Sequence, residues 1–255
     1  MIAPTDSLTG WLIASLLISL RISPVLAFAP PFTLMRVPAL FRVLLSLGLS
    51  GLMAAGLPGL TPPPAEAGAL AAAAARELLL GATIVLAFQA AFGALYVAGR
   101  TVDIQAGFGL AALVDPTSRA QTPLVGSIYA YAAGVVFFAM GGHLDLLRIV
   151  AASLEAVPLG RATLPSDLGP LAAYLGTVFT LAFGVVGGLI LVLFLTDIAI
   201  ALLSRTAPQL NVLVLGFQVK TALLMIAMPL TLGVSGALLA RMSSTVLQAL
   251  PALMT

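Results

Sequence analysis

Residues 171–203 read LAAYLGTVFTLAFGVVGGLILVLFLTDIAIALL and contain a single charged residue, Asp197. About 20 apolar residues suffice for a helix to cross the hydrocarbon core of a membrane. In lipid, every backbone N–H and C=O needs a partner inside the protein, and a helix provides one for each. The segment therefore predicts a membrane helix that is too long to stand upright. Gly184, Gly187 and Gly188 are the expected point of a bend and also permit close contact with a neighbouring helix.

Five further apolar stretches surround this one, and the composition agrees with them. Hydrophobic residues make up 61% of the 255-residue chain and charged residues 8%, against roughly 25% charged residues in an ordinary soluble domain. The mean hydropathy is +1.16. The alternating segments of a transmembrane β-barrel are absent. We predict an all-α polytopic membrane protein with about six long apolar helices, at residues 8–29, 37–57, 78–98, 124–142, 171–203 and 212–240.

The segments between these stretches are also informative. Prolines predict a stiff connector over residues 58–75, in which the alanine-rich residues 67–75 restart a helix. The longest polar segment covers residues 143–170, and Asn211 can cap the last stretch. The first stretch has no basic residue before it, so we predict a retained membrane helix and not a signal peptide.

Several classes of function are excluded or disfavoured by what the sequence lacks. There is no cysteine and only one histidine, His143, so thiol chemistry and a histidine-rich metal centre are excluded. No basic cluster provides the footprint of a nucleic-acid-binding protein. The common nucleophile, zinc and nucleotide-binding motifs are also absent. We therefore expect no enzymatic activity, no cofactor and no metal.

The few polar residues within or beside the apolar stretches need an explanation, because a charge in a membrane is costly. Arg21 either reaches the membrane interface or pairs with a carboxylate of a neighbouring helix. Glu77 either marks the membrane boundary with Arg76 or enters a subunit contact. Asp197 has too short a side chain to reach far, so we expect it to pair inside a protein interface. His143 is expected to cap or hydrogen-bond at the end of a stretch.

Residues 99–123 read GRTVDIQAGFGLAALVDPTSRAQTP and form an unusual link between two stretches. The segment is too polar to span a membrane and too apolar for an aqueous loop. A glycine-jointed apolar loop of this kind is typical of a plug or re-entrant element. The alternative is a connector that lies on the lipid headgroups. The residues assigned to the plug are Gly107, Phe108, Gly109, Leu110, Leu113, Val114, Asp115 and Pro116.

Several motifs resemble those of the FliR family in their order and spacing. This family also includes the T-type subunits of virulence type III secretion systems. The resemblance covers essentially the whole chain, and the ordered set is specific although no single motif is decisive. Intact Val-Asp-Pro and Pro-Gln-x-Asn signatures favour the flagellar branch. The motifs are Arg21-x-x-Pro24, Val37-Pro38-x-x-x-Arg42, Glu77-x-x-x-Gly81, Val114-Asp115-Pro116, Gly142-His143, Arg205-x-x-Pro208-Gln209-x-Asn211 and Gly216-Phe217-x-x-Lys220.

This resemblance implies bent helical hairpins that join FliP-like and FliQ-like subunits in a helical export gate. It implies one domain over residues 1–255, with a FliP-like part at about 1–170 and a FliQ-like part at about 171–255. FlhB and FlhA would be neighbours, and unfolded flagellar substrates would pass outward through the channel. The expected location is the basal body, in the bacterial inner membrane.

The resemblance also implies roles for particular residues. Residues 107–123 match the position of the family's channel plug. Positions near the subunit contacts and the channel entrance, expected to be structural and not catalytic, are Arg205, Pro208, Gln209, Asn211 and Lys220. A small-solute secondary transporter remains the rival outside this family, although such a protein would show paired polar residues at mid-membrane.

Overall fold

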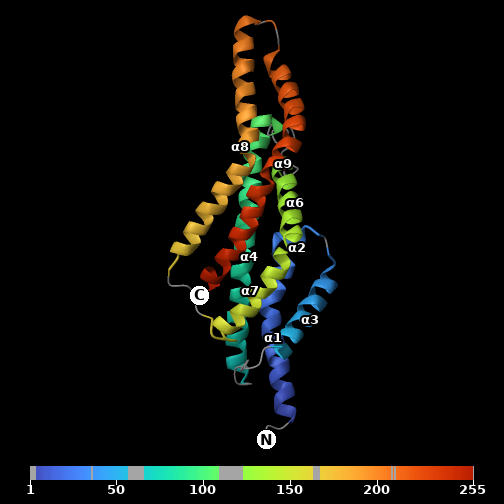
Figure 1. Ribbon diagram of the computed structural model, residues 1–255, viewed down its shortest axis with the longest axis vertical. Helices are drawn as coiled ribbons and strands as arrows, with labels where there is room; N and C mark the ends of the chain where they lie inside the picture. Colours follow the sequence, from blue (N-terminus) through green and yellow to red (C-terminus); the bar gives the residue numbers. More distant parts are fainter. Residues whose placement is uncertain are drawn as a thin grey trace. The chain divides into compact units, whose positions relative to one another are not determined.

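The computed structural model describes residues 4–35, 37–56, 66–108, 123–162, 167–207, 209 and 211–254. All regular secondary structure in these residues is helical, which confirms the all-α prediction. Figure 1 traces the helices in chain order. They are α1 (Pro4–Phe28), α2 (Pro30–Thr33), α3 (Ala39–Gly56), α4 (Ala67–Ala106), α6 (Leu124–Ala139), α7 (Gly142–Ala156), α8 (Gly169–Thr206) and α9 (Val212–Met254).

The number of long apolar helices also agrees with the sequence. By length and composition, five described helices could span a membrane: α1, α3, α4, α8 and α9. The number becomes six if the bent pair of α6 and α7 counts as one span. The predicted stretch at residues 124–142 corresponds to α6, which ends at Ala139, and Gly141 before α7 adopts a positive φ of 75°. Glycine reaches this backbone conformation without steric cost.

The helix boundaries differ from the prediction in three places. The restarted helix at residues 67–75 is continuous with the next stretch, so α4 runs unbroken to Ala106 and includes the first part of the predicted loop. Helix α9 continues beyond residue 240 to Met254. The polar segment 143–170 contains a further helix, α7, which was not predicted because its sequence forms no continuous apolar run. Its Leu146, Val150 and Leu154 recur every four residues and are buried, which is the pattern of an amphipathic helix.

The chain divides into two compact units, and each contains segments from distant parts of the sequence. The first unit comprises residues 1–90, 137–174 and 244–255, and the second comprises residues 91–136 and 175–243. Helices α4, α6, α8 and α9 contribute to both. The predicted correspondence of residues 1–170 and 171–255 to two kinds of sister subunit is a different property and stays a prediction.

In the first unit, α1 packs against α3 through polar side chains. Ser46 and Ser50 of α3 are buried, and the Ser46 hydroxyl donates to the Ser19 carbonyl oxygen of α1 at 3.4 Å. Large apolar residues of α3 point away from the protein, among them Leu40 and Leu52, which are 71% and 72% exposed. Helix α3 therefore turns its serines inward and its leucines outward, which is the arrangement expected of a helix that faces lipid or another apolar chain.

In the second unit, α4 and α6 approach each other closely at a pair of glycines. A Cβ atom added to Gly99 would overlap the backbone of Gly126, so only glycine permits this approach. The predicted contact at Gly188 of α8 is also tight, because a Cβ atom there would lie 3.3 Å from the Thr231 methyl group of α9. A Cβ atom at Gly187 would meet nothing within 4 Å.

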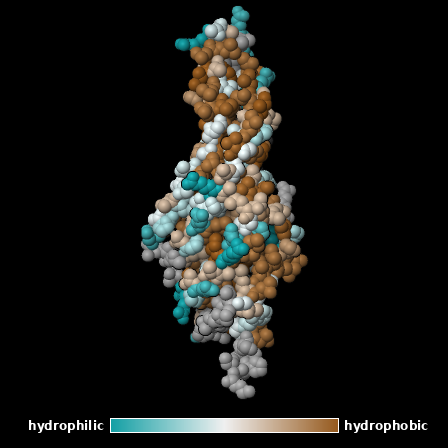
Figure 2. All heavy atoms as spheres, viewed as in Figure 1, coloured by the Kyte–Doolittle hydropathy of each residue, from teal (hydrophilic) through white to brown (hydrophobic). Residues whose placement is uncertain are grey.

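Figure 2 shows brown, apolar atoms over much of the hairpin formed by α8 and α9, and brown atoms mixed with teal and white ones elsewhere on the visible face. Only 11% of the most apolar window of α3 and 17% of that of α9 is buried inside the chain. Exposed apolar area on this scale requires lipid or other protein chains as its surroundings. Hydrophilic atoms gather at the end of the hairpin formed by α8 and α9 (Figures 1 and 2).

Candidate functional site

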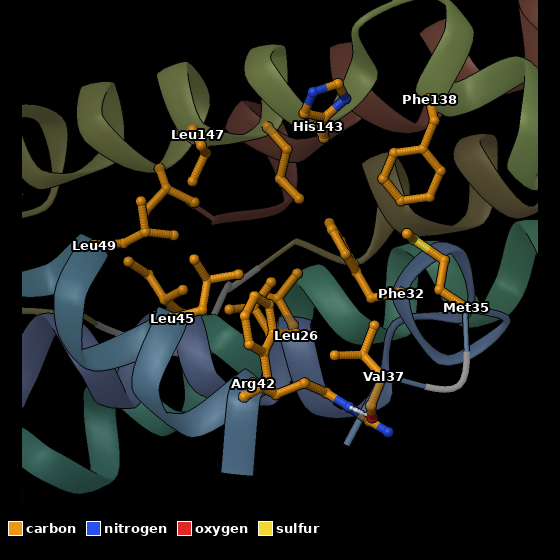
Figure 3. A pocket seen from close by; sticks show the side chains of 15 residues that line it. Leu26, Phe32, Met35, Val37, Arg42, Leu45, Leu49, Phe138, His143 and Leu147 are labelled. Atoms are coloured by element: carbon orange, nitrogen blue, oxygen red, sulfur yellow. Dashed lines mark hydrogen bonds between the residues drawn. The ribbon is translucent and has the colours of Figure 1, made fainter. Parts of the chain in front are cut away.

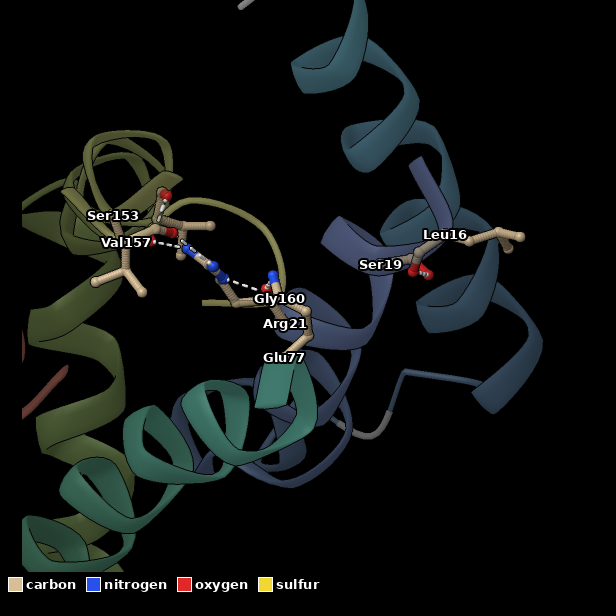
Figure 4. A network of polar contacts seen from close by, with 8 residues as sticks. Leu16, Ser19, Arg21, Glu77, Ser153, Val157 and Gly160 are labelled. Carbon is tan, nitrogen blue, oxygen red and sulfur yellow. Dashed lines mark hydrogen bonds and ion pairs between the residues drawn. The ribbon is translucent and has the colours of Figure 1, made fainter. Parts of the chain in front are cut away.

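The most deeply buried charges of the described residues form an ion pair in the first unit. Arg21 of α1 donates from Nε to the Glu77 carboxylate of α4 at 2.6 Å, and neither side chain is exposed to solvent. The guanidinium also donates to the Ser153 hydroxyl at 2.8 Å and to the Val157 carbonyl oxygen at 3.1 Å. Figure 4 shows these contacts converging on Arg21. The cation thus joins α1 to α4 and to the end of α7.

The second carboxylate oxygen of Glu77 holds the turn that follows α7. It accepts a hydrogen bond from the Gly160 N–H at 2.8 Å, while the neighbouring Arg76 donates to the Gly160 carbonyl oxygen at 2.7 Å. Gly160 has a φ of +73°, which explains the glycine at this position. Two consecutive residues of α4 therefore bind both backbone groups of one buried turn residue.

A close backbone contact lies beside the ion pair. A Cβ atom added to Gly81 would come within 2.7 Å of the Arg21 carbonyl oxygen and 3.0 Å of the Pro24 side chain. Pro24 lies inside α1 and lacks the N–H that a helix normally donates. The motifs Arg21-x-x-Pro24 and Glu77-x-x-x-Gly81 thus meet as one contact, in which the charges pair and the glycine allows the helices to approach. We define the arginine–glutamate cluster as Arg21, Pro24, Arg76, Glu77, Gly81, Ser153 and Gly160.

In the second unit, Lys220 of α9 holds the carboxyl end of α4. Its ammonium group donates to the Gln105 carbonyl oxygen at 3.0 Å and forms an ion pair with Asp197 of α8 at 2.5 Å. A cation near the last carbonyls of a helix also interacts favourably with the helix dipole. The Asp197 side chain is 42% exposed, so this pair is less buried than the one at Arg21.

The predicted plug begins directly after this contact. Gly107 has a φ of +95°, and the Phe108 ring contacts the Phe217 ring edge-to-face with 6.3 Å between centroids. The remaining predicted plug residues lie outside the described part of the chain; they are Gly109, Leu110, Leu113, Val114, Asp115 and Pro116.

Sequence analysis missed Asp103, which is buried in α4. One of its carboxylate oxygens accepts a hydrogen bond from the Val125 N–H at 3.2 Å, in the first turn of α6. The other oxygen has no hydrogen-bond partner among the described residues. Asp103 was overlooked because it lies in the segment 99–123, which was assigned to a loop. Together, Lys220 and Asp103 fix the two helix ends that flank residues 109–122.

The remaining predicted positions are dispersed. Arg205, Gln209 and Asn211 are exposed where α8 passes into α9, and Pro208 lies outside the described residues. The Asn211 side chain accepts from the Val214 N–H at 3.3 Å, which confirms the predicted cap of α9. His143 packs its ring 5.5 Å from that of Phe138, and its buried Nδ1 has no hydrogen-bond partner in the described structure.

These clusters of charged residues are suited to a structural role. The hydrogen bonds of Arg21 join α1 to α4 and α7, and those of Arg76 and Glu77 hold the turn at Gly160, so the cluster is suited to holding helices together. Among the described residues, no group of three His, Cys, Asp or Glu side chains could hold a metal ion. The fold and these contacts define a polytopic helical membrane protein in which the buried pair of Arg21 and Glu77 joins helices to one another.

Comparison with known proteins identifies the family. Residues 12–246 match the model described as bacterial export proteins, family 1. The flagellar biosynthetic protein FliR of Bacillus subtilis is 30% identical over 215 residues, which cover 82% of each chain. FliR of Escherichia coli is 29% identical over 78% of this chain and 76% of its own length. The secretion system apparatus protein SsaT of Salmonella typhimurium is 29% identical over 60% of each. The chain belongs to bacterial export protein family 1.

Proposed function

We propose that the chain is a core subunit of the flagellar type III protein export gate and helps to form and close its channel. The observation that carries this proposal is the similarity to flagellar FliR proteins over about four-fifths of both chains. A location in the inner membrane, at the flagellar basal body, accompanies this role.

The T-subunit of a virulence secretion system is the second candidate. Proteins of that kind, SsaT among them, match at similar identity but over a smaller share of the chain. The longer match to flagellar proteins therefore favours the flagellar role.

Specific partners follow from the proposed role. We infer that FliP-like and FliQ-like subunits cover the apolar face that α9 leaves exposed, with FlhB and FlhA as neighbours and unfolded flagellar proteins as cargo. Only 17% of the most apolar window of α9 is buried inside the chain, so this face is available for a contact with partner subunits.

Co-purification tests the assembly. The chain is tagged, extracted from membranes in mild detergent and isolated, and the bound proteins are identified by mass spectrometry. The expected result is a stable complex with FliP-like and FliQ-like chains. Isolation as a monomer that catalyses saturable uptake of a small solute would replace the proposal with the transporter alternative.

We further propose that residues 107–123 help to close the resting channel. The contacts of Lys220 with Gln105 and of Asp103 with Val125 support this assignment, since they hold both flanking helix ends. The packing of Phe108 on Phe217 gives the segment an apolar start. An apolar element held at both ends can exclude water from a pore and still move between its anchors.

Deletion of residues 108–113 tests the proposed plug. The complex should still assemble, and cells or vesicles that contain it should become permeable to ions and small molecules. Co-purification of partner subunits serves as the control for assembly. Background conductance in a fully assembled deletion variant would show that the segment does not seal the channel.

A further inference from the structure

Two apolar cavities in the first unit share one cation, Arg42 of α3, in their linings. The larger cavity has a volume of about 330 Å³ and is lined by α1, α2, α3, α7 and the end of α6, with Leu26, Leu45 and Leu147 among its walls. The smaller has a volume of about 260 Å³ and includes Pro24 and Val43. Arg42 lines both cavities. The larger one reaches the lower end of the roughly 300–1,000 Å³ range of small-molecule sites.

The walls of the larger cavity are suited to a hydrocarbon chain. Leucine, isoleucine, valine and phenylalanine side chains line it almost entirely. Figure 3 shows Phe138 and His143 on the wall opposite Arg42, with Leu26 and Leu45 nearer to the arginine. Cavities walled by apolar side chains bind apolar ligands. The cavity therefore favours a methylene chain over a polar solute.

Arg42 is the one cation in the linings of these two cavities, and an anionic group on a ligand can pair with it. Its guanidinium donates to the carbonyl oxygens of Val37 and Ala27, both at 2.9 Å. No described Asp or Glu forms an ion pair with it. A guanidinium has five N–H donors, so donors remain for a further acceptor. An arginine with spare donors is well suited to bind a phosphate.

The surroundings identify the source of the phosphate. Helix α3 carries Arg42 and buries only 11% of its apolar window, with its leucines turned outward. One cation that lines two apolar cavities matches a molecule with one anionic headgroup and two hydrocarbon chains. A partner helix could fill the cavities, but its apolar side chains would leave the Arg42 charge uncompensated.

We propose that the first unit binds one anionic phospholipid, with its phosphate on Arg42 and its two acyl chains in the two cavities that Arg42 lines. This site requires only that the chain resides in a membrane, and it does not depend on the export role. The lipid fills the space between α1 and α3 and compensates a charge that the described residues leave unpaired.

Native mass spectrometry of the delipidated, detergent-solubilised complex tests the site. Phosphatidylglycerol is titrated against phosphatidylcholine, which carries the same phosphate beside a compensating cation. We expect the wild type to retain phosphatidylglycerol preferentially. Arg42→Gln should lower its affinity about fivefold, from the contribution of one arginine to anionic-lipid binding, whereas Arg42→Lys should retain most of it. Arg148→Gln removes an exposed arginine and should change nothing.

A second set of variants fills the cavities and keeps the cation. Leu45→Trp fills the larger cavity and Val43→Trp the smaller, and both positions are partly exposed, so the folded chain can accommodate them. Each should weaken retention of the two-chain lipid. Equal binding of both lipids, or wild-type lipid binding by Arg42→Gln and both tryptophan variants, would overturn the proposal. Loss of partner subunits with unchanged lipid binding would instead assign the cavities to a protein interface.

Discussion

Glu77→Gln offers the sharpest test of how this fold is held together. The substitution keeps the size and shape of the side chain and removes its charge. Arg21 then remains fully buried beside a neutral amide, and the Gly160 N–H loses a charged acceptor. The change is confined to the first unit and leaves the apolar helices intact, so any loss of stability reports on the arginine–glutamate cluster.

The expected magnitude follows from the burial of both partners. Breaking a buried ion pair by removing one partner costs about 3–5 kcal/mol in soluble proteins. Polar contacts in membrane proteins are measured at lower values, because the unfolded chain in a membrane also finds partners. We therefore expect the free energy of unfolding to fall by about 3 kcal/mol, which corresponds to roughly a 100-fold change in the folding equilibrium.

The assay is reversible unfolding in mixed micelles by titration with sodium dodecyl sulfate, followed by helical circular dichroism. Asp145→Asn is the matched control, because it breaks the Arg148–Asp145 pair, whose side chains are 76% and 49% exposed. Exposed pairs contribute about 0.2–1 kcal/mol. If Glu77→Gln destabilises the chain no more than Asp145→Asn does, the cluster does not hold these helices together.

Two further predictions concern the second unit. Gly99→Ala should prevent the close approach to Gly126 and reduce the amount of assembled complex, whereas Gly93→Ala on the same helix meets open space and should be tolerated; equal assembly of the two variants would contradict the contact. Lys220→Met should free the Gln105 carbonyl oxygen and lower the free energy of unfolding by about 1–2 kcal/mol. Micelle unfolding measures this loss, and an unchanged value would exclude the capping role.

Sequence patterns predicted the helical class and the long apolar segments because lipid imposes one strong rule on the backbone. Long apolar segments did not reveal α7, because its apolar residues recur with helical spacing and never form a continuous run. Asp103 was assigned to a loop for a related reason: residues 99–123 were too polar to be predicted as a membrane helix. The turn at Gly160 carried a weak signal, a glycine two residues after Pro158.

The partners of the charged residues were beyond reach of sequence reasoning. Arg21 and Glu77 are separated by 56 residues, and nothing in their local patterns shows that α1 and α4 are neighbours. Asp197 was expected to pair, but its partner, Lys220, could be identified only from the packing of α8 against α9. The glycines that matter most for packing were likewise hidden, because Gly99 and Gly126 look like any other small residues of a membrane helix.

Secretion of flagellar proteins into the medium tests the central claim most directly. The gene for this chain is deleted from its own host, and extracellular flagellar protein is quantified by immunoblot before and after the wild-type gene is restored. We predict that secretion stops on deletion, that the unexported subunits remain inside the cell, and that restoration recovers export. Secretion at the wild-type level without the chain would contradict a role in the flagellar export gate.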